Sequence, residues 1–278
     1  MTNLQYPSKM ELANSRIIRL AGLSAVLAGM CYILVGIVHP ANALSSVTTT
    51  RWAAVHVAAC GMSFFGLLGL PGLYARQTVK AGMLGLVGYV LLSLWLVLIM
   101  GFSFFEAFIL PHLATVTPSF VDGWMGIFNG TGSKIDLGVL PTIWTLTGPL
   151  YILGGLSFGI ATFRARILPR GAAVLLALGT ALAPLAGLLP LTSQPKIAIP
   201  TGLALAWLGY ALLAEQSAPA EQHHEHLTAT VVWTAGSFSD FPPQVGFRVK
   251  PTRAENVYTS KEAVVFSRVP CRSGAAGH

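Results

Sequence analysis

Four ionisable side chains stand at or near the ends of long apolar blocks, where they could handle protons or bind a metal: His39, His56, Glu106 and His112. Glu106 follows Phe104 and Phe105, and the apolar residues 107–110 come directly after it. Charged groups at membrane depth are costly, about 2.5 to 3.5 kcal/mol for a central Asp on insertion scales, so they are usually paired. We therefore expect Glu106 to lie close to a histidine or arginine.

The same residues allow three kinds of chemistry. Glu106 and a histidine could bind a proton or substrate in a transporter. Two of His39, His56 and His112 could ligate a haem or a metal from adjacent helices. The carboxylate and an imidazole could also act as general acid and base in an enzyme at the membrane surface. Structural pairing at helix ends is favoured over all three. Because the chain has no phosphate-binding loop, nucleophile elbow or two-cysteine zinc signature, we assign no catalytic or metal residue, expect no cofactor and disfavour an enzyme.

The elements that position these residues must lie in a membrane. Of the 278 residues, 54% are hydrophobic and 10% are charged, whereas soluble domains have about 25% charged residues. A block of 19 uncharged residues makes a helix of roughly 28 Å, about the hydrocarbon thickness of a bilayer. Six blocks of about this length or longer occur, at residues 20–38, 53–75, 81–105, 139–163, 171–189 and 197–214. The prediction is an all-α bundle with six transmembrane helices over residues 17–214.

The basic residues predict how this bundle is oriented. One side would hold eight of them: Lys9, Arg16, Arg19, Arg76, Lys80, Arg164, Arg166 and Arg170. The other side would hold three: Arg51, Lys134 and Lys196. The positive-inside rule then places segment 1–16 and the C-terminal tail in the cytoplasm. The first block also imitates a secretory signal, but its length and the spans that follow favour an uncleaved helix.

Small residues recur at a spacing that lets helices approach closely: Ala21, Ala25, Gly29, Gly82, Gly85, Gly88, Gly155 and Gly159. Packing within the chain is favoured, and a face for a homo-oligomer is the alternative. Pro149 and Pro184 fall in the middle of predicted spans, where a proline kinks a helix.

Two segments remain outside the blocks. The loop at residues 111–138 is rich in aromatic residues, so we expect it to lie on the membrane surface with Trp124 at headgroup depth. The tail at residues 215–278 is polar and proline-rich, and we expect it to be largely disordered or not a selected sequence. A metal at His223, His224 and His226 is less favoured than a solvated polar run. No basic patch interleaved with aromatics supports nucleic acid as a partner, despite the net charge of +7.

Several short motifs carry a resemblance to known proteins. The first apolar block ends in His39-Pro40 and is followed by Arg51-Trp52 and His56. Two longer motifs follow, Leu70-Pro71-Gly72-Leu73-Tyr74-Ala75-Arg76 and Ile167-Leu168-Pro169-Arg170. Over residues 16–214 the chain resembles uncharacterised multi-pass membrane proteins of bacteria. This resemblance implies a helical bundle in the bacterial inner membrane and names no activity, substrate or ligand. The lipid bilayer is the expected partner, and a structural, sensing or transport component is favoured over a haem or metal protein or a membrane-surface enzyme.

Overall fold

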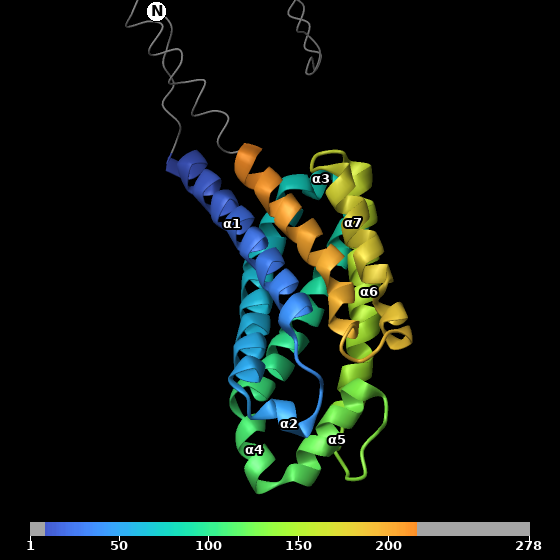
Figure 1. Ribbon diagram of the computed structural model, residues 1–278. Coiled ribbons are helices and arrows are strands. Elements are labelled where there is room, and N and C mark those ends of the chain that lie inside the picture. Colours follow the sequence, from blue (N-terminus) through green and yellow to red (C-terminus); the bar gives the residue numbers. More distant parts are fainter. Residues whose placement is uncertain (1–8, 216–278) are drawn as a thin grey trace, which may run out of the picture. The chain divides into compact units, whose positions relative to one another are not determined.

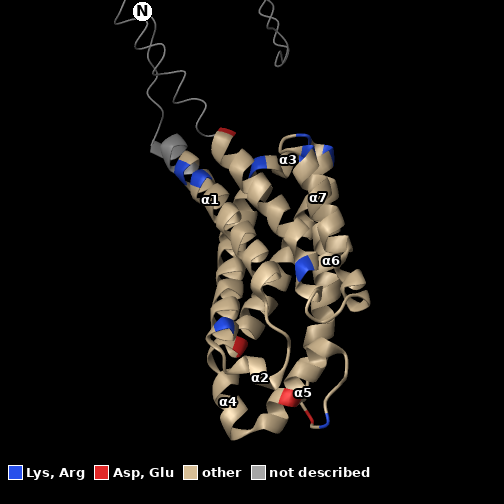
Figure 2. Cartoon of the chain, in the orientation of Figure 1, with Lys and Arg blue, Asp and Glu red and all other residues tan. Residues whose placement is uncertain are grey.

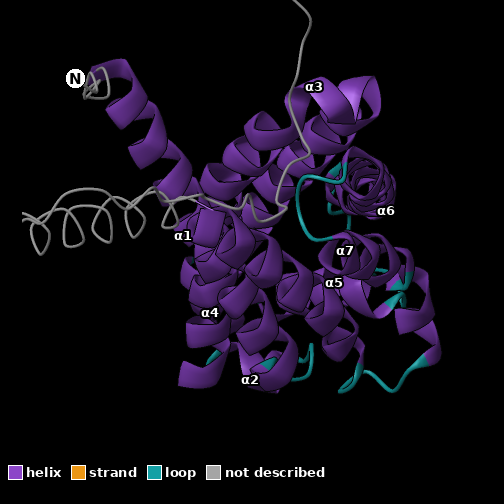
Figure 3. Cartoon of the chain, turned by 90° about the horizontal axis from the view of Figure 1, so that it is seen from above, coloured by secondary structure: helices purple, strands orange, loops and turns teal. Residues whose placement is uncertain are grey.

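The computed structural model describes residues 9–215, with side chains from residue 15 onward, and this part is helical without strands (Figures 1 and 3). All of it belongs to one compact unit. In chain order the elements are α1 (Lys9–Val38), α2 (Leu44–Val47), α3 (Thr50–Phe108), α4 (Leu110–Val116), α5 (Pro118–Asn129), α6 (Leu140–Ala165), α7 (Arg170–Ala181) and two 3-10 helices, η1 (Ala183–Leu188) and η2 (Gln194–Ala198). The chain then continues as a helix from η2, and we call Gln194–Glu215 the 194–215 helix. The all-α prediction is confirmed for these residues, and the predictions for the tail lie outside them.

Four of these helices are long and apolar enough to cross a membrane. They are Ser15–Val38 within α1, the whole of α3, α6, and the 194–215 helix. Each contains an 18-residue window of high mean hydropathy with at most two charged residues. These helices agree with a membrane-embedded protein.

Helix α3 has 59 residues and turns back on itself at Gly82. The sequence predicted two helices joined by a linker at residues 76–80, but the helix runs through that linker without a break. Gly82 has φ 57° and ψ −156°, a conformation that is essentially restricted to glycine. The ends of α3 meet because the Trp52 indole N–H donates to the Glu106 carbonyl oxygen at 2.9 Å. Residues 50–81 and 83–108 therefore form the first and second arms of a helical hairpin.

The predicted span at residues 171–189 differs from the structure. Helix α7 ends at Ala181 after 12 residues, which is roughly 18 Å and too short to cross a bilayer alone. Pro184 follows near the start of η1, where its missing N–H cannot continue an α-helical ladder. Pro149, in contrast, lies inside the continuous helix α6. A count of six transmembrane helices is thus not confirmed.

The small residues noted in the sequence bring helices of this chain together. A Cβ atom added at Gly69 of α3 would lie 2.7 Å from the backbone nitrogen of Ala25, and Ala21 faces Gly72 in the same way. One added at Gly29 would overlap the backbone of the 194–215 helix. On α6, Gly155 and Gly159 face α7, which lies beside it when seen from above (Figure 3). Seven of the eight predicted packing positions therefore make close contacts within the chain, and the exception is Gly82, where an added Cβ atom would have no neighbour within 4 Å.

The charged residues are distributed unequally between the two ends of the bundle. Figure 2 shows Lys and Arg gathered where α1 begins and where α6 passes into α7. Fewer lie at the opposite end, which α2, α4 and α5 close. We call these the basic end and the α5 end.

Candidate functional site

The start of α3 is held in place by two side-chain hydrogen bonds. Thr49 caps the helix, its hydroxyl accepting the Trp52 backbone N–H at 3.2 Å. The Arg51 guanidinium donates to the Val38 carbonyl at 2.7 Å and so ties α3 to the end of α1. One turn further on, the His56 side chain points into the bundle and is 3% exposed.

The hairpin brings His56 against Glu106 at the α5 end. His56 Nε2 lies 3.3 Å from Glu106 Oε2, and Glu106 is 6% exposed. The His39 ring stands edge-on to the His56 ring, with 5.1 Å between the ring centroids. Three of the four predicted cluster residues thus lie together. His112 does not join them, because it lies exposed on α4, beyond the turn at Ile109 that ends α3.

The hydrogen bonds of His56 restrict where a proton can sit. His56 Nδ1 lies 2.8 Å from the Trp52 carbonyl oxygen, which can only accept, so Nδ1 carries a hydrogen. Nε2 faces Glu106 Oε2, so one proton resides on either the imidazole or the carboxyl group. The pair has no net charge in either arrangement. A further proton would leave a single positive charge in a buried site.

Trp124 closes the site from α5. Its indole N–H donates to Glu106 Oε1 at 3.1 Å, and the side chain is 2% exposed. Trp124 therefore contacts protein, whereas its expected position at headgroup depth stays a prediction. The turn after α4 folds α5 back over the hairpin, so that an aromatic residue of the predicted surface loop contacts protein instead of lipid.

Aromatic rings surround the carboxylate and exclude water from it. Phe105 lies 4.5 Å from Trp124 and Phe102 lies 5.6 Å from it, measured between ring centroids. Trp144 of α6 contacts Phe102 from the other side. At the far end of α5, the Asn129 amide donates to the Asn42 carbonyl at 2.9 Å and anchors the helix. This shell strengthens electrostatic interactions inside the site by lowering the local dielectric constant.

His39, which follows the end of α1, is the partner most open to solvent. Burial lowers its pKa below the ordinary value of 6.5, and the nearby His56 lowers it further. A hydrogen bond between Nδ1 and the Pro40 carbonyl, together with Glu106, opposes this shift without cancelling it. Near pH 7 the imidazole of His39 is therefore neutral.

The nitrogen and oxygen atoms of His56 and Glu106 that could ligate a metal already have partners in the protein. Both ring nitrogens of His56 and both carboxylate oxygens of Glu106 have protein partners. Within residues 9–215 no group of three or more His, Cys, Asp or Glu residues is arranged to hold a metal ion. Haem ligation by His39 and His56 would require these contacts to break, and the histidines at 223–226 lie outside the described residues.

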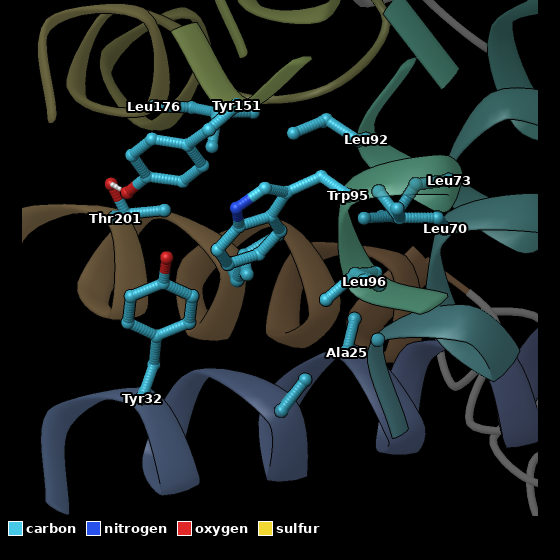
Figure 4. Close-up of a pocket in the computed structure, with 13 residues that line it drawn as sticks. Ala25, Tyr32, Leu70, Leu73, Leu92, Trp95, Leu96, Tyr151, Leu176 and Thr201 are labelled. Carbon is cyan, nitrogen blue, oxygen red and sulfur yellow. Dashed lines mark hydrogen bonds between the residues drawn. The ribbon is translucent and has the colours of Figure 1, made fainter. Parts of the chain in front are cut away.

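A small cavity between α1, α3, α6 and the 194–215 helix was not predicted from the sequence (Figure 4). Its volume is about 20 Å³, enough for one water molecule. Tyr151 donates to the Thr201 hydroxyl at 2.8 Å on its wall, and Tyr32 and Trp95 stack beside it. Tyrosines inside apolar blocks were the signal that could have indicated it.

Comparisons with family models, with curated proteins and with solved structures find no match to this chain.

Proposed function

We propose that the chain is a multi-pass protein of the bacterial inner membrane, with six membrane-crossing segments and both termini in the cytoplasm. The arms of α3 would be roughly 48 and 39 Å long, each enough for one crossing, and α7 with η1 would form the fifth segment. The eight-to-three distribution of basic residues supports this orientation, as does the resemblance at residues 16–214. The α5 end then faces outward.

Its function, in this proposal, is transport or sensing linked to proton binding at His56 and Glu106. The observation that carries the proposal is the buried contact between His56 Nε2 and Glu106 Oε2, closed by Trp124. Ionisable groups within membrane proteins commonly mark proton relays and substrate pathways. A stable protein does not require this pair, since well-packed apolar residues of similar volume are often equally stabilising.

The hydrogen bonds indicate how a proton would act. A carboxylate accepts hydrogen bonds more strongly than a protonated carboxyl group does. When a second proton binds the pair, the bond from Trp124 to Glu106 weakens and the site acquires a net positive charge. Hydration stabilises that charge, so proton binding favours a state in which α5 has moved away from the hairpin.

Distances between α5 and α3 test this coupling. Spin labels at Ser119→Cys and Thr50→Cys, both exposed, report on it once Cys31, Cys60 and Cys271 are replaced by serine. We expect a second distance population to grow as the pH falls. Glu106→Gln removes one of the two proton-binding groups of the pair, so the pH dependence of that population should differ from that of the parent.

Glu215→Gln is the matched control, because Glu215 pairs with Arg76 at the opposite end of the bundle. It should follow the parent protein at every pH. A distance distribution that does not change with pH in the parent would contradict the proposal.

A further inference from the structure

The basic end holds an open pocket of about 490 Å³ that four cations line. Lys80 comes from the end of the first arm of α3, Arg164 and Arg166 from the end of α6, and Arg170 from the start of α7. Its other lining residues are Phe163 and Ala165, so no acidic side chain offsets the charge. Within residues 9–215, none of the four cations forms an ion pair with an acidic side chain.

The turn between α6 and α7 makes these cations converge. Arg166 caps α6 in the left-handed conformation, with φ 56°, so the chain reverses within a few residues. Arg170 then stacks its guanidinium 3.9 Å above the Phe163 ring. This contact holds one cation at the border between the pocket and the apolar surface of the bundle.

An apolar groove of about 290 Å³ begins at the same phenylalanine. It runs between α6 and α7, where Gly159 allows the helices to approach closely. Leu156 and Ile160 line one wall, and Val174 and Leu178 line the other. Leu178 is 57% exposed and Val174 is 41% exposed, so the groove is open to the side of the bundle. Phe163 therefore joins a basic pocket to a groove in which every side chain is apolar.

We propose that this joined site binds a phospholipid with an anionic headgroup. The phosphate lies among Lys80, Arg164, Arg166 and Arg170, and an acyl chain occupies the groove between α6 and α7. Guanidinium groups match the geometry of phosphate oxygens, and basic pockets between transmembrane helices commonly bind such headgroups. Free inorganic phosphate shares the headgroup chemistry but leaves the groove unused. The site does not depend on His56 or Glu106, so either proposal can fail alone.

Native mass spectrometry of the full chain in mild detergent tests the headgroup site. Phosphatidylglycerol is titrated against phosphatidylcholine with the same acyl chains, and the parent should prefer phosphatidylglycerol. Each basic residue near an anionic headgroup contributes about 1 kcal/mol. Arg166→Gln/Arg170→Gln should therefore weaken phosphatidylglycerol binding roughly 30-fold.

Arg16→Gln/Arg19→Gln is the matched control, since it removes two exposed arginines from α1 at the same end of the bundle. If contacts of the pocket cations with the headgroup determine the affinity, this variant should bind phosphatidylglycerol within about twofold of the parent. Lys80→Gln/Arg164→Gln removes the other two cations and repeats the test without altering the Arg170–Phe163 contact. Equal losses in the control and pocket variants, or no loss in either pocket variant, would overturn the proposal.

A substitution that fills the groove distinguishes lipid binding from the binding of free phosphate. Val174→Trp places a large ring between α6 and α7 while keeping all four cations. Phosphatidylglycerol binding should fall by at least tenfold, whereas binding of inorganic phosphate, measured by titration calorimetry, should not change. If the parent binds inorganic phosphate tightly and does not discriminate between the two lipids, the site is a phosphate site and the lipid proposal is wrong.

Discussion

The two ends of the bundle differ in whether their charged side chains are buried and paired. At the α5 end, His56 and Glu106 are buried, and every polar atom of the pair has a partner supplied by the protein. At the basic end, four cations line an open pocket without an acidic neighbour. The first arrangement restricts access to a proton and requires motion to expose it. The second exposes positive charge that no acidic side chain of the pocket offsets. The α5 end therefore depends on contacts within the protein, whereas the basic end depends on the anions that are present outside it.

The largest effect on the unfolding free energy is expected when the buried pair of His56 and Glu106 is broken. Glu106→Ala leaves the His56 ring and the Trp124 indole N–H without their partner, and breaking a buried pair costs about 3–5 kcal/mol of unfolding free energy. The measurement is reversible unfolding in mixed detergent micelles. Glu215→Gln, which removes an ion pair that is partly exposed, should cost less than about 1 kcal/mol. Equal losses would remove the contrast between the ends.

A smaller effect is expected when the site keeps its shape and loses one hydrogen bond. Trp124→Phe retains an aromatic ring against Phe105 and removes the N–H that reaches Glu106 Oε1. Hydrogen bonds to charged groups contribute about 1.5–3 kcal/mol, so the unfolding free energy should fall by that amount. Trp144→Phe, which alters a neighbouring ring on α6, is the control. A change below about 0.5 kcal/mol for Trp124→Phe would show that Trp124 packs without acting on the carboxylate.

Acid should weaken the α5 end through His39. Its pKa is lowered in the folded protein, chiefly by burial, so the unfolded chain binds more protons as the pH falls. The contribution of neutral His39 is complete above its ordinary pKa of 6.5 and is lost as the pH falls through the lowered value. Thermal unfolding between pH 8 and pH 5 should show a falling Tm. The fall should be smaller in His39→Gln, which lacks this imidazole; His56, Glu106 and Arg51 are the other ionisable groups close to it. An identical slope in both proteins would exclude His39 as its source.

The smallest effect is expected at the basic end. Arg164→Gln removes an exposed cation that makes no ion pair within residues 9–215, so the unfolding free energy in detergent should change by less than about 0.5 kcal/mol. The same unfolding assay measures it. A loss above about 1 kcal/mol would mean that the basic end, like the α5 end, stabilises the protein through contacts of its own.

The proximity of His56 and Glu106 could be predicted because it follows from hairpin geometry. His56 lies 26 residues before Gly82 and Glu106 lies 24 residues after it, so two helices of equal rise return them to the same level. The order and length of the predicted helices were therefore enough to predict that a histidine lies beside the Glu106 carboxylate. His39 joined because α1 ends beside the start of α3.

Other features depend on the path of the chain in three dimensions. Trp124 stands in a loop whose composition is typical of a membrane surface, and nothing local indicates that α5 folds back over Glu106. Hydropathy at residues 171–189 did not reveal that the α-helix stops before Pro184. The arginines after α6 predicted an orientation, but their convergence with Lys80 depends on a left-handed turn at Arg166.

The single-glycine turn at Gly82 has a consequence for biosynthesis. The two arms of α3 emerge from the ribosome one after the other, and the polar residues 76–80 between their apolar stretches are part of the first arm instead of a separate loop. They can enter the bilayer as one insertion unit, and Glu106 meets its histidine as soon as the second arm is complete. The Glu106 carboxylate then has its histidine partner within its own hairpin before α6 is synthesised, so the later helices assemble around a unit whose α5 end already holds this pair.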